Sequence, residues 1–306
     1  MRAIWRRRER FQDLALFLLK LRQPDHSDRF KTIIQHFGEH HLMNRTLSSL
    51  VLAGGLLAGG QAVAGDLLHW QNNSLTYLYG QDYKIDPEIQ QTVTFEHASG
   101  WAIGDLFFFV DTIKYNTDAT NGAGDGHTFY GEFSPRLSFG KLFNSKLEFG
   151  PIKDVLLATT YEFGEDDVES YLIGPGFDLA IPGFDYFSLN FYNRTTDGKR
   201  DGDNVWQITP VWSYTIPVGK SDIVIDGFMD WVVDNDKSYH ANLHFNPQIK
   251  YDLGKAMSWG EKQLYVGIEY DYWKDKYGIE DSGFVSDNFV GATDQNTASL
   301  LVKAHF

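Results

Sequence analysis

Carboxylates and aromatic rings recur at every second position in several separate stretches of the chain. One stretch carries Asp105, Phe107, Phe109 and Asp111, and another carries Asp226, Phe228 and Asp230. Stacking a planar base on an aromatic side chain contributes about 1–3 kcal/mol, and carboxylates accept hydrogen bonds from hydroxyl and amino groups. Side chains of these two kinds, presented together, suit a planar, polar and uncharged solute.

The spacing of two residues indicates β-strands, because successive side chains of a strand point to opposite faces. Residues 241–253 show the pattern almost without interruption. Leu243 and Ile249 belong to an apolar set, whereas His244 and Lys250 belong to a polar set. Each such strand is predicted to have one apolar face and one polar face.

Twelve segments of this kind are predicted, and none carries a sustained helical period. They lie near residues 74–83, 88–97, 103–115, 128–139, 154–164, 169–181, 184–195, 204–216, 222–234, 240–253, 263–274 and 296–306. A soluble sandwich hides its apolar faces between two sheets, whereas a membrane barrel turns them to lipid. The predicted strands are long enough to cross a bilayer at a tilt, while strands of globular proteins average about 5–6 residues. Their length favours the barrel.

Aromatic residues and connection lengths also favour the barrel. Aromatic residues crowd the strand ends, as in interfacial girdles: Tyr214, Trp231, Tyr251, Tyr270 and Tyr272. Short connections at 98–104, 181–185 and 216–222 alternate with long ones at 116–127, 195–204 and 275–295. Four prolines fall inside predicted strands, where each costs a ladder bond and predicts a local bulge: Pro135, Pro175, Pro210 and Pro247.

The chain ends on NTASLLVKAHF, in which Leu300, Val302, Ala304 and Phe306 share one face. This ending resembles the C-terminal signal by which bacterial outer-membrane barrels are recognised for assembly. The sequence therefore predicts an all-β fold, a single transmembrane antiparallel β-barrel of about 12 strands in the bacterial outer membrane. Its partners would be outer-membrane lipid and, through the last strand, the assembly machinery.

The first 64 residues differ from the rest of the chain. Residues 43–64 combine Arg45, an apolar stretch and the small-residue site Ala62-Val63-Ala64, which is the pattern of a signal peptide. Residues 1–42 are interpreted as an extension from a start codon assigned too early, and residues 65–306 as the barrel. The mature protein is expected to begin near Gly65, with 17 Lys and Arg against 36 Asp and Glu.

Composition excludes several classes of protein. The 306 residues contain no Cys and have a net charge of −14 and a pI near 5.1. Disulfides, thiol catalysis and Cys-based zinc sites are therefore excluded, and a nucleic-acid polymer is not an expected partner. No apolar run long enough for a transmembrane helix occurs after the signal segment. Neither a cofactor nor a metal is expected.

Residues 132–154 read EFSPRLSFGKLFNSKLEFGPIKD. This segment resembles the nucleoside-specific channel-forming outer-membrane family, the Tsx-like channels, with the related phage-receptor barrels called OmpK. The matching positions are Glu132, Pro135-Arg136, Ser138 and Phe149-Gly150-Pro151, and GFMDWVV at 227–233 and the terminal Phe306 are similar too. The resemblance implies a monomeric twelve-stranded channel that passes nucleosides and is sometimes exploited by phage or colicins.

The alternation predicts which side chains point into the lumen. The candidates for contact with nucleosides or similar small polar solutes are Asp105, Phe107, Phe109, Tyr130, Glu132, Arg136, Tyr192, Asp226, Phe228, Asp230, His244 and Glu269. Small barrels also fill their lumen with side chains for stability alone, and this reading stays open for each residue. Arg136, Arg194 and Lys303 in particular are expected to pair with inward carboxylates.

Two other functions remain as alternatives to a passive channel. A barrel-embedded hydrolase needs a nucleophile beside a His that an acid orients. His244 with Asp226 or Asp230 could supply a base, but no matching inward Ser is evident, so the protein is not expected to be an enzyme. A receptor or adhesin without transport would depend on the acidic loops alone.

Overall fold

The computed structural model describes residues 67–116, 126–165, 168–198, 202–236 and 238–306. The predicted extension over residues 1–42, the predicted signal peptide over residues 43–64 and the expected start at Gly65 lie outside the described residues. The described part is mostly β-strand. None of its helices is long and apolar enough to cross a membrane.

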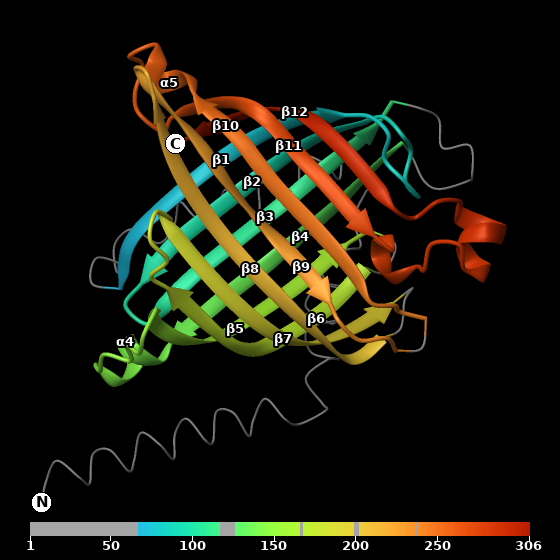
Figure 1. Ribbon diagram of the computed structural model, residues 1–306, viewed down its shortest axis with the longest axis horizontal. Helices are drawn as coiled ribbons and strands as arrows, with labels where there is room; N and C mark the ends of the chain where they lie inside the picture. The colour runs from blue at the N-terminus through green and yellow to red at the C-terminus, as the bar shows by residue number, and fades with distance from the viewer. Residues whose placement is uncertain (1–66, 117–125, 166–167, 199–201, 237) are drawn as a thin grey trace, which may run out of the picture. The chain divides into compact units, whose positions relative to one another are not determined.

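Twelve antiparallel strands close into a barrel in which β12 returns to pair with β1 (Figure 1). The strands are β1 (Leu68–Gly80), β2 (Gln90–Trp101), β3 (Gly104–Tyr115), β4 (His127–Ser138), β5 (Ile152–Gly164), β6 (Val168–Leu179), β7 (Tyr186–Gly198), β8 (Gly202–Val218), β9 (Ser221–Val232), β10 (Asn242–Asp252), β11 (Leu264–Lys274) and β12 (Gln295–His305). Closure leaves no unpaired edge inside a bilayer. The predicted fold is confirmed.

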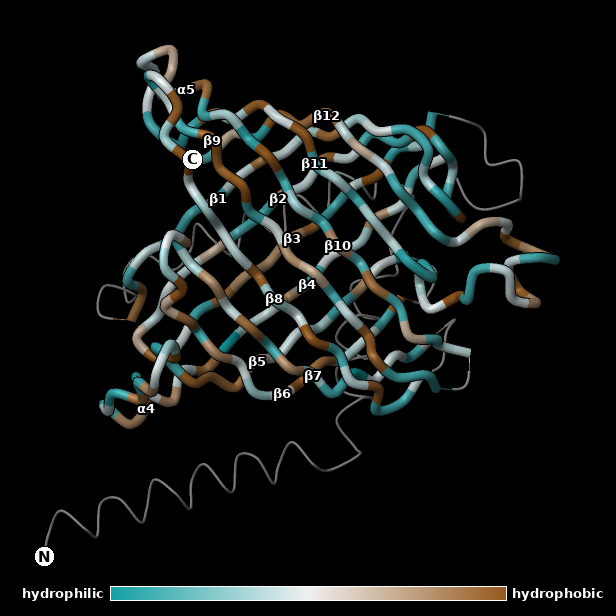
Figure 2. The backbone as a smooth tube through the Cα atoms, in the orientation of Figure 1, coloured by the Kyte–Doolittle hydropathy of each residue, from teal (hydrophilic) through white to brown (hydrophobic). Residues whose placement is uncertain are grey.

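One face of each strand packs inside the barrel, and β12 shows this most regularly. Its buried residues are Gln295, Thr297, Ser299, Leu301 and Lys303, and those between them are exposed. The exposed set includes Leu300 at 67% and Val302 at 45%. Figure 2 shows hydrophobic and hydrophilic residues alternating along the strands. Apolar side chains exposed in this way are stable against lipid rather than water, so the lumen is the polar side.

The two ends of the barrel differ in their connections. At the turn end, which carries the C-terminus, the connections are 102–103, 139–151, 180–185, 219–220 and 253–263. At the loop end they are 81–89, 116–126, 165–167, 199–201, 233–241 and 275–294. Two turn-end connections are longer than the other three because they contain the short helices α4 (Phe139–Phe143) and α5 (Leu253–Ala256) (Figure 1). Ser138 and Asp252 cap these helices by accepting hydrogen bonds from Lys141 and Lys255.

The predicted strand boundaries are wrong at the junction of β7 and β8, at both ends of β1 and at the end of β2, which reaches Trp101 instead of residue 97. The predicted loop 195–204 belongs largely to β7 and β8, with only residues 199–201 between the strands. Its Asp and Gly content indicated a loop, but strand ends that extend past a bilayer tolerate polar residues. Strand β1 begins at Leu68 instead of residue 74 and ends at Gly80 instead of residue 83. Its first residues pair with β2 only, which is why their side chains do not follow the apolar alternation.

The four prolines within strands do not form the predicted bulges. Pro135, Pro175, Pro210 and Pro247 pair with the preceding strand, and the ladder toward the following strand is interrupted beside each of them. The register is the same on both sides of every interruption. A proline lacks an N–H group and so removes a ladder bond without inserting a residue. The register shifts lie elsewhere, at Leu68/Trp70, Ile152/Asp154 and Arg194/Thr196.

Candidate functional site

The twelve predicted candidates lie on the lumen faces of their strands. Strand β3 shows this both in its register and in its side-chain contacts. Arg136 of β4 donates a hydrogen bond to Asp105, and the ring of Phe109 packs on Tyr130 of β4. The intervening Phe108 points outward and meets Phe95 and Phe163, at centroid distances of 6.4 and 6.5 Å. Whether the twelve side chains contact a solute stays a prediction.

A first row of aromatic rings follows β3 and β4. The centroids of Phe107 and Phe109 are 5.9 Å apart, and those of Phe109 and Tyr130 are 5.8 Å apart. Phe107 is 39% exposed although it is on the lumen face. Its ring is therefore in contact with open lumen space and is not packed into the wall.

A second row of rings follows β9, β10 and β11. Phe228 meets His244 edge to face at 5.1 Å, and His244 stacks on Trp273 at 3.9 Å. Trp273 in turn contacts Tyr277, which follows β11, at 5.4 Å. Strands β3 and β9 are six strands apart in both directions around the closed barrel, so the two rows lie on opposite walls.

Four lumen carboxylates accept hydrogen bonds from uncharged donors. Their contacts are Thr94 to Asp111 at 2.5 Å, Tyr130 to Glu132 at 2.8 Å, Gln207 and Thr209 to Asp230 at 2.8 and 2.6 Å, and Gln248 to Glu269 at 2.8 Å. None of the four is in an ion pair with Lys or Arg within the described ranges. These carboxylates keep lone pairs that can accept further hydrogen bonds from a solute.

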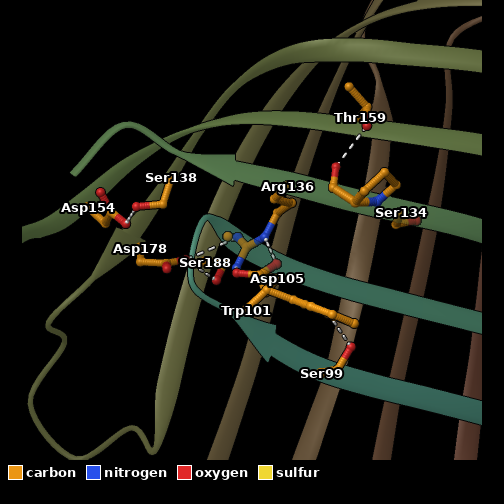
Figure 3. A network of polar contacts seen from close by, with 12 residues as sticks. Ser99, Trp101, Asp105, Ser134, Arg136, Ser138, Asp154, Thr159, Asp178 and Ser188 are labelled. Carbon is orange, nitrogen blue, oxygen red and sulfur yellow. Dashed lines mark hydrogen bonds and ion pairs between the residues drawn. The ribbon is translucent and has the colours of Figure 1, made fainter. Parts of the chain in front are cut away.

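Four other clusters in the lumen are ion pairs, as predicted for Arg136, Arg194 and Lys303. Arg136 donates to Asp105 at 2.8 Å and to Asp178 at 3.0 Å (Figure 3). The other three pairs are Arg194 with Glu162 at 2.5 Å, Lys250 with Asp226 at 2.7 Å, and Lys303 with Glu96. Glu162 and Lys250 were not among the predicted lumen candidates, although both lie at alternating inward positions.

The motif at residues 132–154 builds the turn end of the lumen wall. Ser138 donates to Asp154 at 2.5 Å and caps α4, while Arg136 connects β4 to β3 and β6 (Figure 3). Gly150 has a φ of +56°, a left-handed conformation that favours glycine. The side-chain contacts of Arg136 and Ser138 are thus structural ones.

Among the described residues, the partner of His244 in the lumen is a carboxylate and not a nucleophile. The Nε2 atom of His244 lies 3.1 Å from Asp271, not from the predicted Asp226 or Asp230, and no Ser hydroxyl bonds it in the described part of the chain. Asp226 is instead the partner of Lys250. A base without an adjacent nucleophile does not form the arrangement that acyl transfer needs.

A Ser–His–Asn contact does exist on the outer face of β1 and β2. His97 lies 3.0 Å from Ser99 Oγ and 2.8 Å from Asn73 Oδ1, and Trp101 Nε1 donates to the same Ser99 oxygen. Ser99 has 0% exposure, so an ester carbonyl has no approach to its hydroxyl. The contact is better explained as mutual satisfaction of polar groups on the outer face.

The family model for nucleoside-specific channel-forming protein, Tsx, matches residues 66–306. The chain belongs to this family. Two outer membrane proteins OmpK of Vibrio parahaemolyticus are similar to this Tsx-family chain. One is 26% identical over 62% of this chain and 71% of its own length, and the other, from strain RIMD 2210633, is 28% identical over 59% and 69%. The predicted location in the outer membrane is confirmed, and the protein is of a channel family.

Among solved structures, a KdgM porin in complex with disordered oligogalacturonate aligns with a TM-score of 0.43 and 10% identity. The alignment covers 76% of this Tsx-family chain and 99% of the porin. The outer membrane protein Omp33 of Acinetobacter baumannii aligns with a TM-score of 0.35 and 10% identity, over 79% and 100% of the two chains. Outer-membrane channel families such as Tsx are in general not enzymes.

Proposed function

We propose that the barrel is a passive channel selective for nucleosides. The observation that carries the proposal is the pair of aromatic rows on opposite walls, each beside carboxylates bonded to uncharged donors. A nucleoside has a flat base that stacks on rings and a sugar whose hydroxyls donate to carboxylates. Weak contacts repeated along the path suit a channel, because a solute also has to leave.

Single-channel recording of the refolded barrel tests the proposal. We expect nucleosides added to the bath to interrupt the ion current in a concentration-dependent way, since a solute held between the rings excludes ions. Free sugars of similar size should interrupt it far less, because they offer no base to stack. Equal block by a nucleoside and by a sugar that lacks the base would contradict nucleoside selectivity.

We further propose that Phe306 is read by the assembly machinery of the outer membrane. Its backbone N–H donates to Asn73 at 2.9 Å, but its side chain is among the exposed ones, at 69%. Truncating an exposed ring should cost the folded barrel little packing energy. Phe306→Ala is therefore expected to reduce the amount of assembled barrel in cells, measured as heat-modifiable gel migration, while barrel refolded in detergent keeps its wild-type melting temperature.

Two outcomes separate recognition from packing in this experiment. Equal assembly of Phe306→Ala and wild type in cells would exclude the recognition role. A melting temperature lowered as much as that of a buried control such as Leu301→Ala, whose residue is 2% exposed, would assign the effect to stability instead.

A further inference from the structure

The first loop of the barrel, residues 81–89, folds into the lumen. Tyr83 is 7% exposed, and its hydroxyl lies 2.8 Å from Ser299 Oγ on the lumen face of β12. Thr297 donates to the carbonyl of Asp82 at 3.2 Å, and the backbone N–H of Lys84 donates to Gln295 at 2.9 Å. Three successive lumen positions of β12 thus hold this loop against the inside of the wall at the loop end of the barrel, which we call the mouth.

Lys276, in the loop over residues 275–294, binds both the first loop and β12. Its side chain is 4% exposed, and its ammonium group donates to Asp86 at 2.9 Å, to Gln295 at 2.8 Å and to the carbonyl of Lys84 at 3.1 Å. The ring centroids of Tyr277 and Tyr83 lie 4.8 and 5.8 Å from the same nitrogen. We call these contacts of Lys276, together with Asp86, Gln295, Tyr277 and Tyr83, the mouth latch.

The backbone at the mouth latch is in a costly conformation. Asp275 and Tyr277 have φ values of +53° and +58°, whereas the +68° of the following Gly278 is a conformation that glycine adopts without cost. A left-handed conformation is unfavourable for a bulky side chain such as Tyr, and it persists only where surrounding contacts enforce it. The hydroxyl of Tyr277 donates to Asp86 at 2.7 Å, so the strained residue is itself bonded into the latch.

The loop is also fixed on the side away from the first loop. The N–H of His240 donates to the carbonyl of Gly278 at 2.9 Å. A Cβ atom at Gly278 would lie 3.0 Å from the ring of Tyr239, so the close approach of the two loops requires glycine. The segment that carries Lys276 is therefore held by the loops on both sides of it.

Tyr83 lies close to the lumen carboxylates. Burial raises its pKa above the ordinary value, the hydrogen bond with Ser299 opposes the rise, and the negative charges of Asp271 and Glu269 add to it. The same carboxylates flank the second aromatic row, since Asp271 bonds His244. Tyr277 is the last ring of that row at the loop end, through its contact with Trp273, and Tyr83 shares the ammonium group of Lys276 with it.

We propose that the mouth latch sets the width of the opening at the loop end, and that Lys276 determines the largest solute that the channel admits. Without the ammonium group, the loops over residues 81–89 and 275–294 lose the hydrogen bonds that connect them. Asp86, Gln295 and the carbonyl of Lys84 all accept from that group. This proposal concerns the size of the opening and does not depend on which solute binds deeper in the lumen.

Lys276→Met tests the proposal, with Lys274→Met as its matched control. Methionine keeps the length of the side chain but removes the charge, so the latch opens. We expect open-channel conductance and current noise to rise, and uncharged oligosaccharides that wild type excludes to enter proteoliposomes in a swelling assay. Lys274 is 54% exposed, and its ion pairs within the described residues are with Asp275 and Asp294 at 3.6 and 3.5 Å. Its replacement therefore removes the same charge while leaving the latch closed.

Two further variants keep the test decisive if Lys276→Met fails to fold. Asp86→Asn removes the charge that faces the ammonium group, and Tyr83→Ala removes the ring from the mouth. Both should admit larger sugars than wild type does. Wild-type conductance and an unchanged size limit in the folded variants would overturn the proposal. All readouts use ions and sugars, so absence of nucleoside block would leave the result interpretable.

Discussion

Arg194→Met is expected to lower the free energy of unfolding of the barrel by about 3–5 kcal/mol, the usual cost of breaking a buried ion pair from one side. Arg194 donates five hydrogen bonds: to both oxygens of Glu162 at 2.5 Å, to Gln207 and Ser170 at 3.1 Å, and to Thr196 at 3.2 Å. Glu162 is 6% exposed and lies directly opposite Glu132 on the neighbouring strand. Without the guanidinium group, Glu162 is an uncompensated charge away from bulk water, directly opposite a second carboxyl group.

Urea unfolding of the barrel in lipid vesicles measures this change. The double variant Arg194→Met, Glu162→Gln should recover much of the loss, because it leaves no uncompensated charge. Lys146→Met serves as a control, since Lys146 and Glu148 are 3.8 Å apart with exposures of 86% and 60%, and it should change stability little. A loss below about 1 kcal/mol for Arg194→Met would mean that water or Gln207 satisfies Glu162 equally well.

Phe107→Ala and Phe109→Ala are each expected to weaken nucleoside block of the ion current. A stacking contact of about 1–3 kcal/mol corresponds to roughly a fivefold to hundredfold change in affinity. The effect should be smaller for Phe107, because its 39% exposure lets water replace part of the lost contact. Block is measured as the concentration of nucleoside that halves the current through single channels.

Phe108→Ala is the matched control for these two variants. Its ring is on the outer face against Phe95 and Phe163, so truncation should lower stability and leave block unchanged. The three neighbouring positions thus test register and function together, since a shift by one residue would exchange the two outcomes. If neither Phe107→Ala nor Phe109→Ala alters block in channels that still conduct, the rings of β3 do not contact the solute.

The alternation of side chains predicted most of the fold because a barrel in lipid enforces it. With lipid outside and water inside, each residue of a strand points either to the lipid face or to the lumen face. The alternation was therefore enough to assign Leu300 to the lipid face and Lys303 to the lumen face. The constraint ends where the strand leaves the bilayer. For that reason the start of β1 and the junction of β7 and β8 were misplaced, although both segments are strand.

The prolines and the mouth latch depend on information that a local pattern does not contain. A proline at position 210 predicts a lost bond, but whether the chain inserts a residue to compensate depends on the neighbouring strands. Lys276 and Asp86 are 190 residues apart in sequence, in loops without any period, so no spacing connects them. His244 was identified correctly as an inward residue, but its expected partner was Asp226 or Asp230 and its actual partner is Asp271, because several carboxylates share that wall.

The pairing of β1 with β12 bears on the order in which the barrel forms. This seam joins the two ends of the described chain through seven residue pairs, whereas β1 and β2 share twelve. Pairing β1 with β12 brings together segments from the two ends of the barrel sequence, so the chain loses conformational entropy before the first hydrogen bond of the seam forms. Hairpins between neighbouring strands therefore form earlier. Lys276 and Asp86 belong to the two loops that flank the seam, and their ion pair cannot form until the cylinder has closed. The opening that admits solute is therefore shaped by the last step of folding.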